Sequence, residues 1–200
     1  MIKYFDIFAG IGGFRSGLEK AGGFECVGYC EIDKYAKKAY ETLYDTENEV
    51  YYDDARKIDP NELPDFDLIC GGFPCQSFSI AGKRGGFDDA RGTLFFEIAR
   101  IAAVKKPKYL LLENVPGLLS HDSGRTFATI LGSLDELGYD VAWQVLNSAN
   151  FRVAQSRKRV FIIGFLREKC AGKVLSFTDA NPKTLVQRIP GREGCRGYSA

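Results

Sequence analysis

Histidine is nearly absent from this chain, because His121 is the only one among 200 residues. The six cysteines contain no CxxC pair and no compact ladder. A structural metal site is therefore not expected, since zinc sites take clustered cysteine and histidine ligands. A chain of this length that lacks a leader also does not fit a disulfide-stapled scaffold, so we expect reduced thiols. The cysteines are Cys26, Cys30, Cys70, Cys75, Cys170 and Cys195.

Long apolar runs are absent as well. No stretch approaches the roughly 20 residues that a membrane-spanning helix needs. The first residues, MIKYFDIFAG, lack the charged region and cleavage site of a signal peptide. We therefore expect a cytoplasmic protein with no membrane partner. Hydrophobic residues make up 45% of the chain and charged residues 26%, which is typical of a globular domain with a sizeable core.

A net charge of +1 neither indicates nor excludes nucleic acid as a partner, but the basic residues are unevenly placed. Residues 181–200 hold four basic side chains and a single acidic one, Glu193. A second basic group consists of Arg152, Arg157, Lys158 and Arg159. Such groups are usually solvated surface, and they are also what a phosphate-contacting face needs.

Strand-like and helix-like segments alternate along the chain. Short apolar runs predict strands at 4–8, 24–30, 50–52, 66–70, 109–112, 139–146 and 160–165. Helical spacing predicts helices at 12–20, 34–43, 93–104 and 126–137. This alternation predicts an α/β fold: a doubly wound, mostly parallel sheet covered on both faces, with an antiparallel closing strand pair. Ligands of such sheets bind outside the carboxyl ends of the strands, where the strand order switches.

The turn after the first expected strand is rich in glycine, with the sequence FAGIGG from Phe8 to Gly13. Such a turn lets a ligand approach the backbone closely, and a tight turn without a ligand is the alternative. A dinucleotide fingerprint would need glycine at position 15, which is Arg15. A pyrophosphate cofactor is therefore disfavoured.

Two acidic residues follow the next strands. Glu31 comes about twenty residues after the glycines, and an acidic residue at this position typically accepts hydrogen bonds from a ribose. The alternative is that Glu31 is an ordinary surface carboxylate. Asp54 suits an adenine amino group, although Asp53 beside it leaves that choice open. Glycines without phosphate signals, together with two acids, suit a nucleoside that carries positive charge. S-adenosylmethionine (AdoMet) fits this description.

Cys75 directly follows Pro74, at the mouth of a loop rich in glycine and polar residues. A thiolate in irregular backbone at the carboxyl end of a strand can be exposed and activated. Cys70, inside its strand, is expected to be buried and inert. Since His121 cannot be placed as a base for Cys75, a Cys-His hydrolase is disfavoured.

Two further segments carry polar side chains next to strands. Glu113 and Asn114 follow four apolar residues, where a partly desolvated carboxyl group can keep a proton available; a helix or turn cap is the alternative. Gln155, Arg157 and Arg159 share one face of an extended segment before the last strand, unless they are ordinary strand-edge residues.

Five motifs, in this order, resemble those of the DNA cytosine-C5 methyltransferase family from about Lys3 to Phe165. FAGIGG resembles the cofactor loop of that family and GFPCQSFS its nucleophile loop, while GTLFFEI, ENV and QSRKR match further motifs. The resemblance implies an AdoMet-dependent methyltransferase (Rossmann-like) fold. It also implies transfer of a methyl group from AdoMet to C5 of a flipped-out cytosine in duplex DNA.

The resemblance implies roles for individual residues as well. Cys75 would add to C6 of the cytosine, Glu113 would hold and protonate N3, and Arg159 would contact O2. Arg157 would support the DNA and the loop at 76–91, which would close over the base. The implied cofactor contacts are Phe8, Gly10, Ile11, Gly13, Glu31, Ile32, Asp54 and Leu94. The implied substrate contacts are Gln76, Ser79, Asn114 and Gln155.

The sequence departs from the family pattern in two ways. Ile32 stands where many members have a large aromatic residue that packs on adenine, which points to weaker cofactor binding. The sequence-reading domain and a late Gly-Asn-Ser/Ala-Val motif are missing, so we expect either a truncated chain or the catalytic half of a split enzyme. We expect an AdoMet-binding catalytic domain at 1–175 and, in the basic tail at 176–200, the start of a target-recognition region.

The favoured function is methylation of cytosine C5 in duplex DNA, with a second polypeptide supplying recognition. The alternatives are an RNA cytosine-C5 methyltransferase and a non-autonomous catalytic or assembly subunit of a split methyltransferase. A nicotinamide-dependent oxidoreductase is disfavoured by the glycine spacing. The expected setting is a bacterial or phage-infected cell, in restriction–modification, phage self-protection or regulation.

Overall fold

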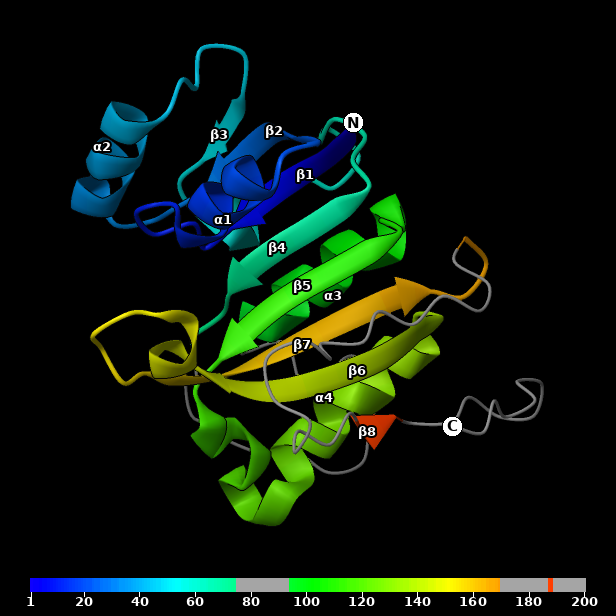
Figure 1. Ribbon diagram of the computed structural model, residues 1–200. Coiled ribbons are helices and arrows are strands. Elements are labelled where there is room, and N and C mark those ends of the chain that lie inside the picture. The colour runs from blue at the N-terminus through cyan, green and yellow to red at the C-terminus, as the bar shows by residue number, and fades with distance from the viewer. Residues whose placement is uncertain (75–93, 170–186, 189–200) are drawn as a thin grey trace.

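The computed structural model describes residues 1–74, 94–169 and 187–188 (Figure 1). These residues contain an eight-stranded sheet with the order β3-β2-β1-β4-β5-β7-β6-β8. The strands are β1 (Ile2–Ile7), β2 (Phe24–Cys30), β3 (Val50–Tyr52), β4 (Leu68–Gly72), β5 (Tyr109–Asn114), β6 (Tyr139–Asn147), β7 (Lys158–Leu166) and β8 (Gln187–Arg188). The α-helices are α1 (Gly13–Ala21), α2 (Lys34–Leu43), α3 (Leu94–Lys105) and α4 (Arg125–Glu136). Short 3-10 helices in the connections are η1 (Ala55–Lys57), η2 (Pro116–Leu119), η3 (His121–Gly124) and η4 (Ser148–Phe151).

The sheet is parallel on one side and antiparallel on the other. Strands β1 to β5 pair in parallel, whereas β7 pairs antiparallel with both β5 and β6. The chain builds outward from β1 to β3 and then returns to β4, on the other side of β1. The strand order therefore switches between β1 and β4, where ligands bind in doubly wound sheets. The predicted fold class, including the antiparallel closing pair, is confirmed.

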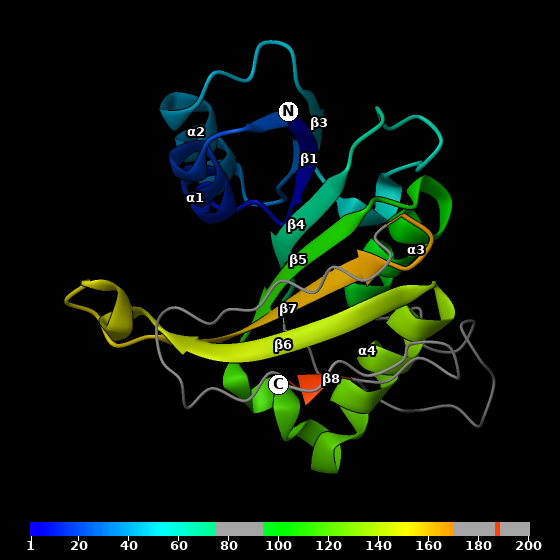
Figure 2. The same ribbon diagram turned by 45° about the vertical axis from the view of Figure 1, so that its right-hand side comes forward.

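Alternate side chains of β1 pack on opposite faces of the sheet, as strand geometry requires. Phe5 and Ile7 are fully buried in the larger core, which includes residues of α3 and α4. Tyr4 packs instead with Leu18 of α1. Figures 1 and 2 show α3 and α4 on one face of the sheet and α1 on the other. Burial of each large apolar side chain stabilises the fold by about 1.5–3 kcal/mol.

β4 and β5 each run two residues further at the carboxyl end than their apolar runs predict. β4 continues through Gly71 and Gly72, where the sequence predicts a break, and β5 continues through Glu113 and Asn114. Glycine is required at position 71 because a Cβ there would lie 1.9 Å from the carbonyl oxygen of Ile7. The double glycine therefore serves strand packing and not a turn. No apolar run predicts β8 or the 3-10 helices.

One acidic side chain is enclosed on the α1 face of the sheet. Asp6 of β1 is completely buried, and its carboxyl group accepts hydrogen bonds from the Tyr40 hydroxyl at 3.3 Å and the Cys70 thiol at 3.7 Å. Burial raises the pKa of Asp6 to about 8. An unfolded aspartate loses its proton near about pH 4, so the folded state binds more protons between that pH and about pH 8. The free energy of unfolding should therefore fall as the pH rises through this window.

Replacing Asp6 by asparagine is expected to flatten this pH dependence. Relative to Asp6→Asn, the wild-type chain should lose up to about 1.4 kcal/mol of unfolding free energy per pH unit within the window. Urea unfolding at several pH values checks this expectation. The control is Asp59→Asn. The backbone N–H of Asn61 lowers the pKa of the exposed Asp59 carboxyl, so this group does not titrate between about pH 4 and pH 8. Parallel pH profiles for the wild-type chain and Asp6→Asn would contradict the prediction.

Candidate active site

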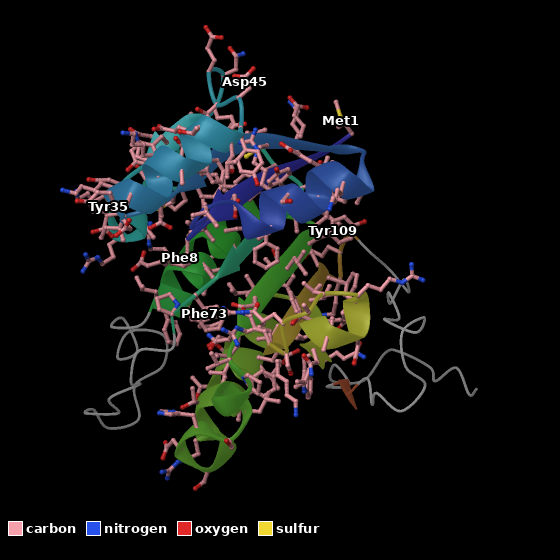
Figure 3. The ribbon with its side chains drawn as sticks, turned by 60° about the vertical axis from the view of Figure 1, so that its left-hand side comes forward. Met1, Phe8, Tyr35, Asp45, Phe73 and Tyr109 are labelled. Atoms are coloured by element: carbon pink, nitrogen blue, oxygen red, sulfur yellow. The ribbon has the colours of Figure 1, made fainter. Side chains whose placement is uncertain are left out.

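Several of the residues singled out in the sequence lie at one edge of the sheet, at the carboxyl ends of the parallel strands. Phe8 follows β1 and Phe73 follows β4, and Figure 3 shows both residues at this edge. Glu31 directly follows β2, and Glu113 lies at the end of β5. Because neighbouring parallel strands end together, the edge assembles these groups around the switch point between β1 and β4.

The glycine-rich turn after β1 is bound to the end of β2. Phe8, Gly10 and Gly12 have positive φ angles of 56°, 57° and 88°. The backbone N–H of Gly10 donates to one carboxylate oxygen of Glu31 at 2.7 Å. The other Glu31 oxygen accepts the N–H of Asp33 at 2.7 Å, and Glu31 is 9% exposed. Glu31 therefore fixes the turn, in addition to the ribose contact predicted for it.

The other predicted cofactor residues lie in this turn, after β2 and β3, and at the start of α3. Ile11 and Ile32 are 61% and 69% exposed and present apolar surface to solvent. Asp54 caps η1 and binds the Arg56 guanidinium at 2.7 Å. Hydrogen bonding from that guanidinium lowers the pKa of the Asp54 carboxyl to about 2. An adenine contact by Asp54 would share the carboxylate with Arg56. Leu94 begins α3 and is half-buried.

Glu113 and Arg159 form an ion pair between the ends of β5 and β7. Arg159 Nε lies 2.6 Å from Glu113 Oε1, and the two side chains are only 20% and 23% exposed. The other carboxylate oxygen, Oε2, lies over Gly72 of β4, where a Cβ would come within 2.8 Å of it. Glycine at position 72 therefore leaves room for the carboxylate. The pairing of β5 with β7 brings together two residues that the sequence predicts separately.

Asn114 connects the end of β5 to the segment that leads into Cys75. Its side-chain amide donates to the carbonyl oxygen of Phe73 at 2.8 Å, and its side-chain oxygen accepts the N–H of Val115 at 2.8 Å. Asn114 is 2% exposed. It therefore fixes Phe73, two residues before Cys75, at the strand edge next to Glu113. Its predicted contact with substrate stays a prediction.

The polar residues before β7 lie in an exposed turn. Gln155 and Arg157 are exposed, the chain bends at Gln155, and β7 begins directly after Arg157. The face that Gln155, Arg157 and Arg159 are predicted to share stays a prediction. The side-chain oxygen of Asn147 accepts the N–H of Arg157 at 3.1 Å, which closes the connection between β6 and β7. Arg159, inside β7, is the member of this group that pairs with Glu113.

Cys75, Gln76 and Ser79 lie outside the described residues, as does the loop at 76–91 that is predicted to close over the base. The prediction for Cys70 is confirmed. Cys70 is fully buried in β4, and burial raises the pKa of its thiol well above the usual range.

Within the described ranges, no three His, Cys, Asp or Glu side chains gather closely enough to hold a metal ion. No helix in the same ranges is long and apolar enough to cross a membrane.

Two residues of this edge are not predicted from the sequence. Gly72 makes room for Glu113, and Tyr44 donates its hydroxyl to the carbonyl oxygen of Gly12 at 2.9 Å. The glycine pair at the end of an apolar run was the available signal for Gly72. No sequence pattern marks Tyr44 as a contact of the turn, since a tyrosine at the end of a helix is usually part of the buried helix face.

Comparison with known proteins identifies the family. Residues 2–192 match the family described as C-5 cytosine-specific DNA methylase. The chain is 50% identical over 185 residues to the type II methyltransferase M1.ScrFI of Lactococcus lactis subsp. cremoris, and this match covers 92% of the chain and 46% of that protein. It is 41% identical over 188 residues to the orphan methyltransferase M.SPRI of Bacillus phage SPR, covering 94% of the chain and 43% of that protein.

Solved structures share the fold. The crystal structure of a Spodoptera frugiperda DNMT2 mutant matches with a TM-score of 0.65 at 22% identity, over 82% of this chain and 50% of that one. At this identity the likeness shows the fold alone. The chain spans about half the length of the curated relatives it matches, 46% of one and 51% of another. Since the family match extends over nearly all of its residues, the chain belongs to the C-5 cytosine-specific DNA methylase family.

Proposed function

We propose that this chain transfers a methyl group from AdoMet to C5 of a cytosine in duplex DNA, through a covalent bond between Cys75 and C6. The hydrogen bond from Asn114 to the carbonyl oxygen of Phe73 carries this proposal. It holds the segment that leads into Cys75 beside the ion pair of Glu113 and Arg159. A carboxyl group and a guanidinium at one strand edge, with a cysteine two residues after Phe73 in the sequence, suit covalent chemistry on a polar ring.

The turn after β1 fits AdoMet. A Cβ added to Gly10 or Gly13 would meet no described atom within 4 Å, which leaves open space for a ligand above the turn. Glu31 keeps acceptor capacity for ribose hydroxyls beyond its two backbone bonds, because a carboxylate offers about four acceptor sites. When bound, AdoMet supplies an electrophilic methyl group on its sulfonium. The proposed cofactor contacts are Phe8, Gly10, Ile11, Gly13, Glu31, Ile32, Asp54 and Leu94.

The chemistry explains the need for a cysteine. C5 of cytosine is too poor in electrons to attack a methyl donor, and addition of the Cys75 thiolate to C6 makes C5 nucleophilic. Glu113 would hold the N3 edge and give N3 a proton as negative charge builds, while Arg159 would contact O2. After methyl transfer, water would take the C5 proton, the Cys75 thiolate would leave C6, and N3 would return its proton to Glu113, which restores the ring.

The target base has to leave the duplex to meet these groups, at a cost of a few kcal/mol. The proposed loop closure at 76–91 would carry Cys75 to the base and exclude water. Arg157 would support the loop and the DNA backbone. The proposed substrate contacts are Gln76, Ser79, Asn114 and Gln155.

We also propose that a second segment or polypeptide supplies sequence recognition. The chain aligns with only 46% of the length of one relative and 43% of another. Burial along β5 agrees with a missing layer: Leu110 and Leu112 are fully buried on the α3 face, whereas Tyr109 and Leu111 on the α1 face are half-buried. Residues 1–175 would form the catalytic part, in the bacterial or phage-infected cells where such relatives occur.

Methylation of duplex DNA with labelled AdoMet tests the proposal. The modified nucleoside is identified after digestion, with the chain alone and with the chain plus the C-terminal half of M1.ScrFI. We expect 5-methyldeoxycytidine in at least one arm, and none with Cys75→Ser. A methyl group on an exocyclic amino group would contradict the proposal. Methylation of RNA in preference to DNA would favour the RNA alternative.

A further inference from the structure

Tyr44, which directly follows α2, binds the glycine-rich turn two residues after the one that Glu31 binds. Its hydroxyl donates to the carbonyl oxygen of Gly12 at 2.9 Å. Its ring lies against the same residue, because a Cβ on Gly12 would come within 2.3 Å of ring carbon Cε2. Gly12 has φ 88° and ψ 38°, in the left-handed region that favours glycine, and it begins α1 with no side-chain cap among the described residues. Tyr44 therefore fixes a glycine whose backbone could otherwise adopt many conformations.

Arg15 of α1 supports Tyr44 from within the fold. Its guanidinium carbon lies 4.6 Å from the centroid of the Tyr44 ring, in cation–π geometry, and its side chain is 6% exposed. The guanidinium also donates to the Glu49 carboxylate at 2.8 Å and to the carbonyl oxygen of Asp45 at 2.8 Å. One buried cation therefore joins α1, the Tyr44 ring and the segment after α2.

The turn thus has two anchors with a single residue between them. Glu31 binds the N–H of Gly10 at 2.7 Å, Tyr44 binds the carbonyl oxygen of Gly12, and Ile11 between them is 61% exposed. Both anchors act on backbone groups. They therefore set the direction of the N–H groups in the turn and in the first turn of α1, which are groups that could bind the carboxylate of AdoMet.

We propose that Tyr44, supported by Arg15, is a positioning residue that holds the turn in its ligand-binding conformation before AdoMet arrives and so sets the affinity. This inference rests on the function proposed above. The physical reason is preorganisation: a turn that is already fixed loses less conformational freedom on binding, which leaves more of the contact energy for affinity.

Tyr44→Phe tests the proposal because it removes the hydroxyl and keeps the ring. We expect the affinity for S-adenosylhomocysteine, measured by isothermal titration calorimetry, to fall about threefold to tenfold, as for the loss of one hydrogen bond. Amide hydrogen exchange at residues 8–13 of the ligand-free chain should become faster. The matched control is Tyr29→Phe, which removes a hydroxyl bond to Glu41 at 2.7 Å in the same group of tyrosines and should change neither quantity.

Weaker binding and faster exchange in Tyr44→Phe, with neither in Tyr29→Phe, would support the positioning role. If the wild-type chain binds S-adenosylhomocysteine and Tyr44→Phe binds it equally well, the positioning role is overturned alone, since the hydroxyl then serves only the fold. Unchanged exchange at residues 8–13 would overturn it as well. A wild-type chain that binds no S-adenosylhomocysteine would overturn the proposed cofactor together with this inference.

Discussion

Methyl transfer by Glu113→Gln is expected to be at least about a hundredfold slower than by the wild-type chain. A glutamine side chain has no carboxyl group, so it cannot give N3 of the base a proton. The substitution also removes the charge that pairs with Arg159, whose Nε lies 2.6 Å from the Glu113 carboxylate. The rate is measured with labelled AdoMet and duplex DNA, in whichever arm supports turnover: the chain alone or the chain with the second half of a relative. The melting temperature should change little.

The matched control for this substitution is Glu97→Gln in α3. Glu97 also lies in an ion pair, with Arg100 at 2.8 Å, and its side chain is 16% exposed. Because this pair is built on one helix and takes no part in the proposed chemistry, Glu97→Gln should keep the wild-type rate. If Glu113→Gln were as fast as Glu97→Gln, the role proposed for Glu113 would be wrong.

Gly71→Ala is expected to lower the free energy of unfolding by about 3 kcal/mol or more. The new Cβ would lie 1.9 Å from the carbonyl oxygen of Ile7 and 2.9 Å from its Cγ2. A backbone oxygen cannot rotate away, so β1 and β4 have to separate at the point where the strand order switches. For a chain of this length, the melting temperature should fall by about 6–12 °C.

Gly132→Ala is the control for added volume. Gly132 is an exposed residue of α4, and a Cβ there would meet no described atom within 4 Å. Alanine in a helix interior stabilises by about 0.5–1 kcal/mol relative to glycine, so this variant should unfold at a slightly higher temperature. A Gly71→Ala protein as stable as the wild-type chain would show that the close approach of β1 to β4 is wrong.

The sequence predicts most elements because their ends carry local signals. β2 and α2 have the predicted bounds, 24–30 and 34–43, since glycines precede β2 and Asp33 caps α2 through the N–H groups of Tyr35 and Ala36. The ends of β4 and β5 carry glycine and polar residues instead. Their place in the sheet depends on partner strands far away in the sequence, so no local pattern reveals it.

In the candidate site, too, the sequence reveals single residues but not the contacts that depend on distant partners. Glu113 and Arg159 are each recognisable from their motifs, but their contact depends on the β5–β7 register, which places Glu113 opposite Phe161. The face that Gln155 and Arg159 are predicted to share stays a prediction, while the hydrogen bond that closes the turn before β7 depends on Asn147, at the far end of β6. The bond from Tyr44 to Gly12 joins residues 32 positions apart and has no pattern of its own.

Covalent attack by Cys75 is tested most directly by trapping the adduct. Duplex DNA that carries 5-fluorocytosine is incubated with AdoMet and the chain, alone and with the C-terminal half of M1.ScrFI, and the products are separated on a denaturing gel. Fluorine at C5 blocks the proton loss that would release the enzyme, so a protein–DNA adduct should accumulate. Mass spectrometry should locate it at Cys75, and Cys75→Ser should form none. Methylation of ordinary cytosine in the same duplex, with no adduct or with an adduct at another residue, would contradict covalent attack by Cys75.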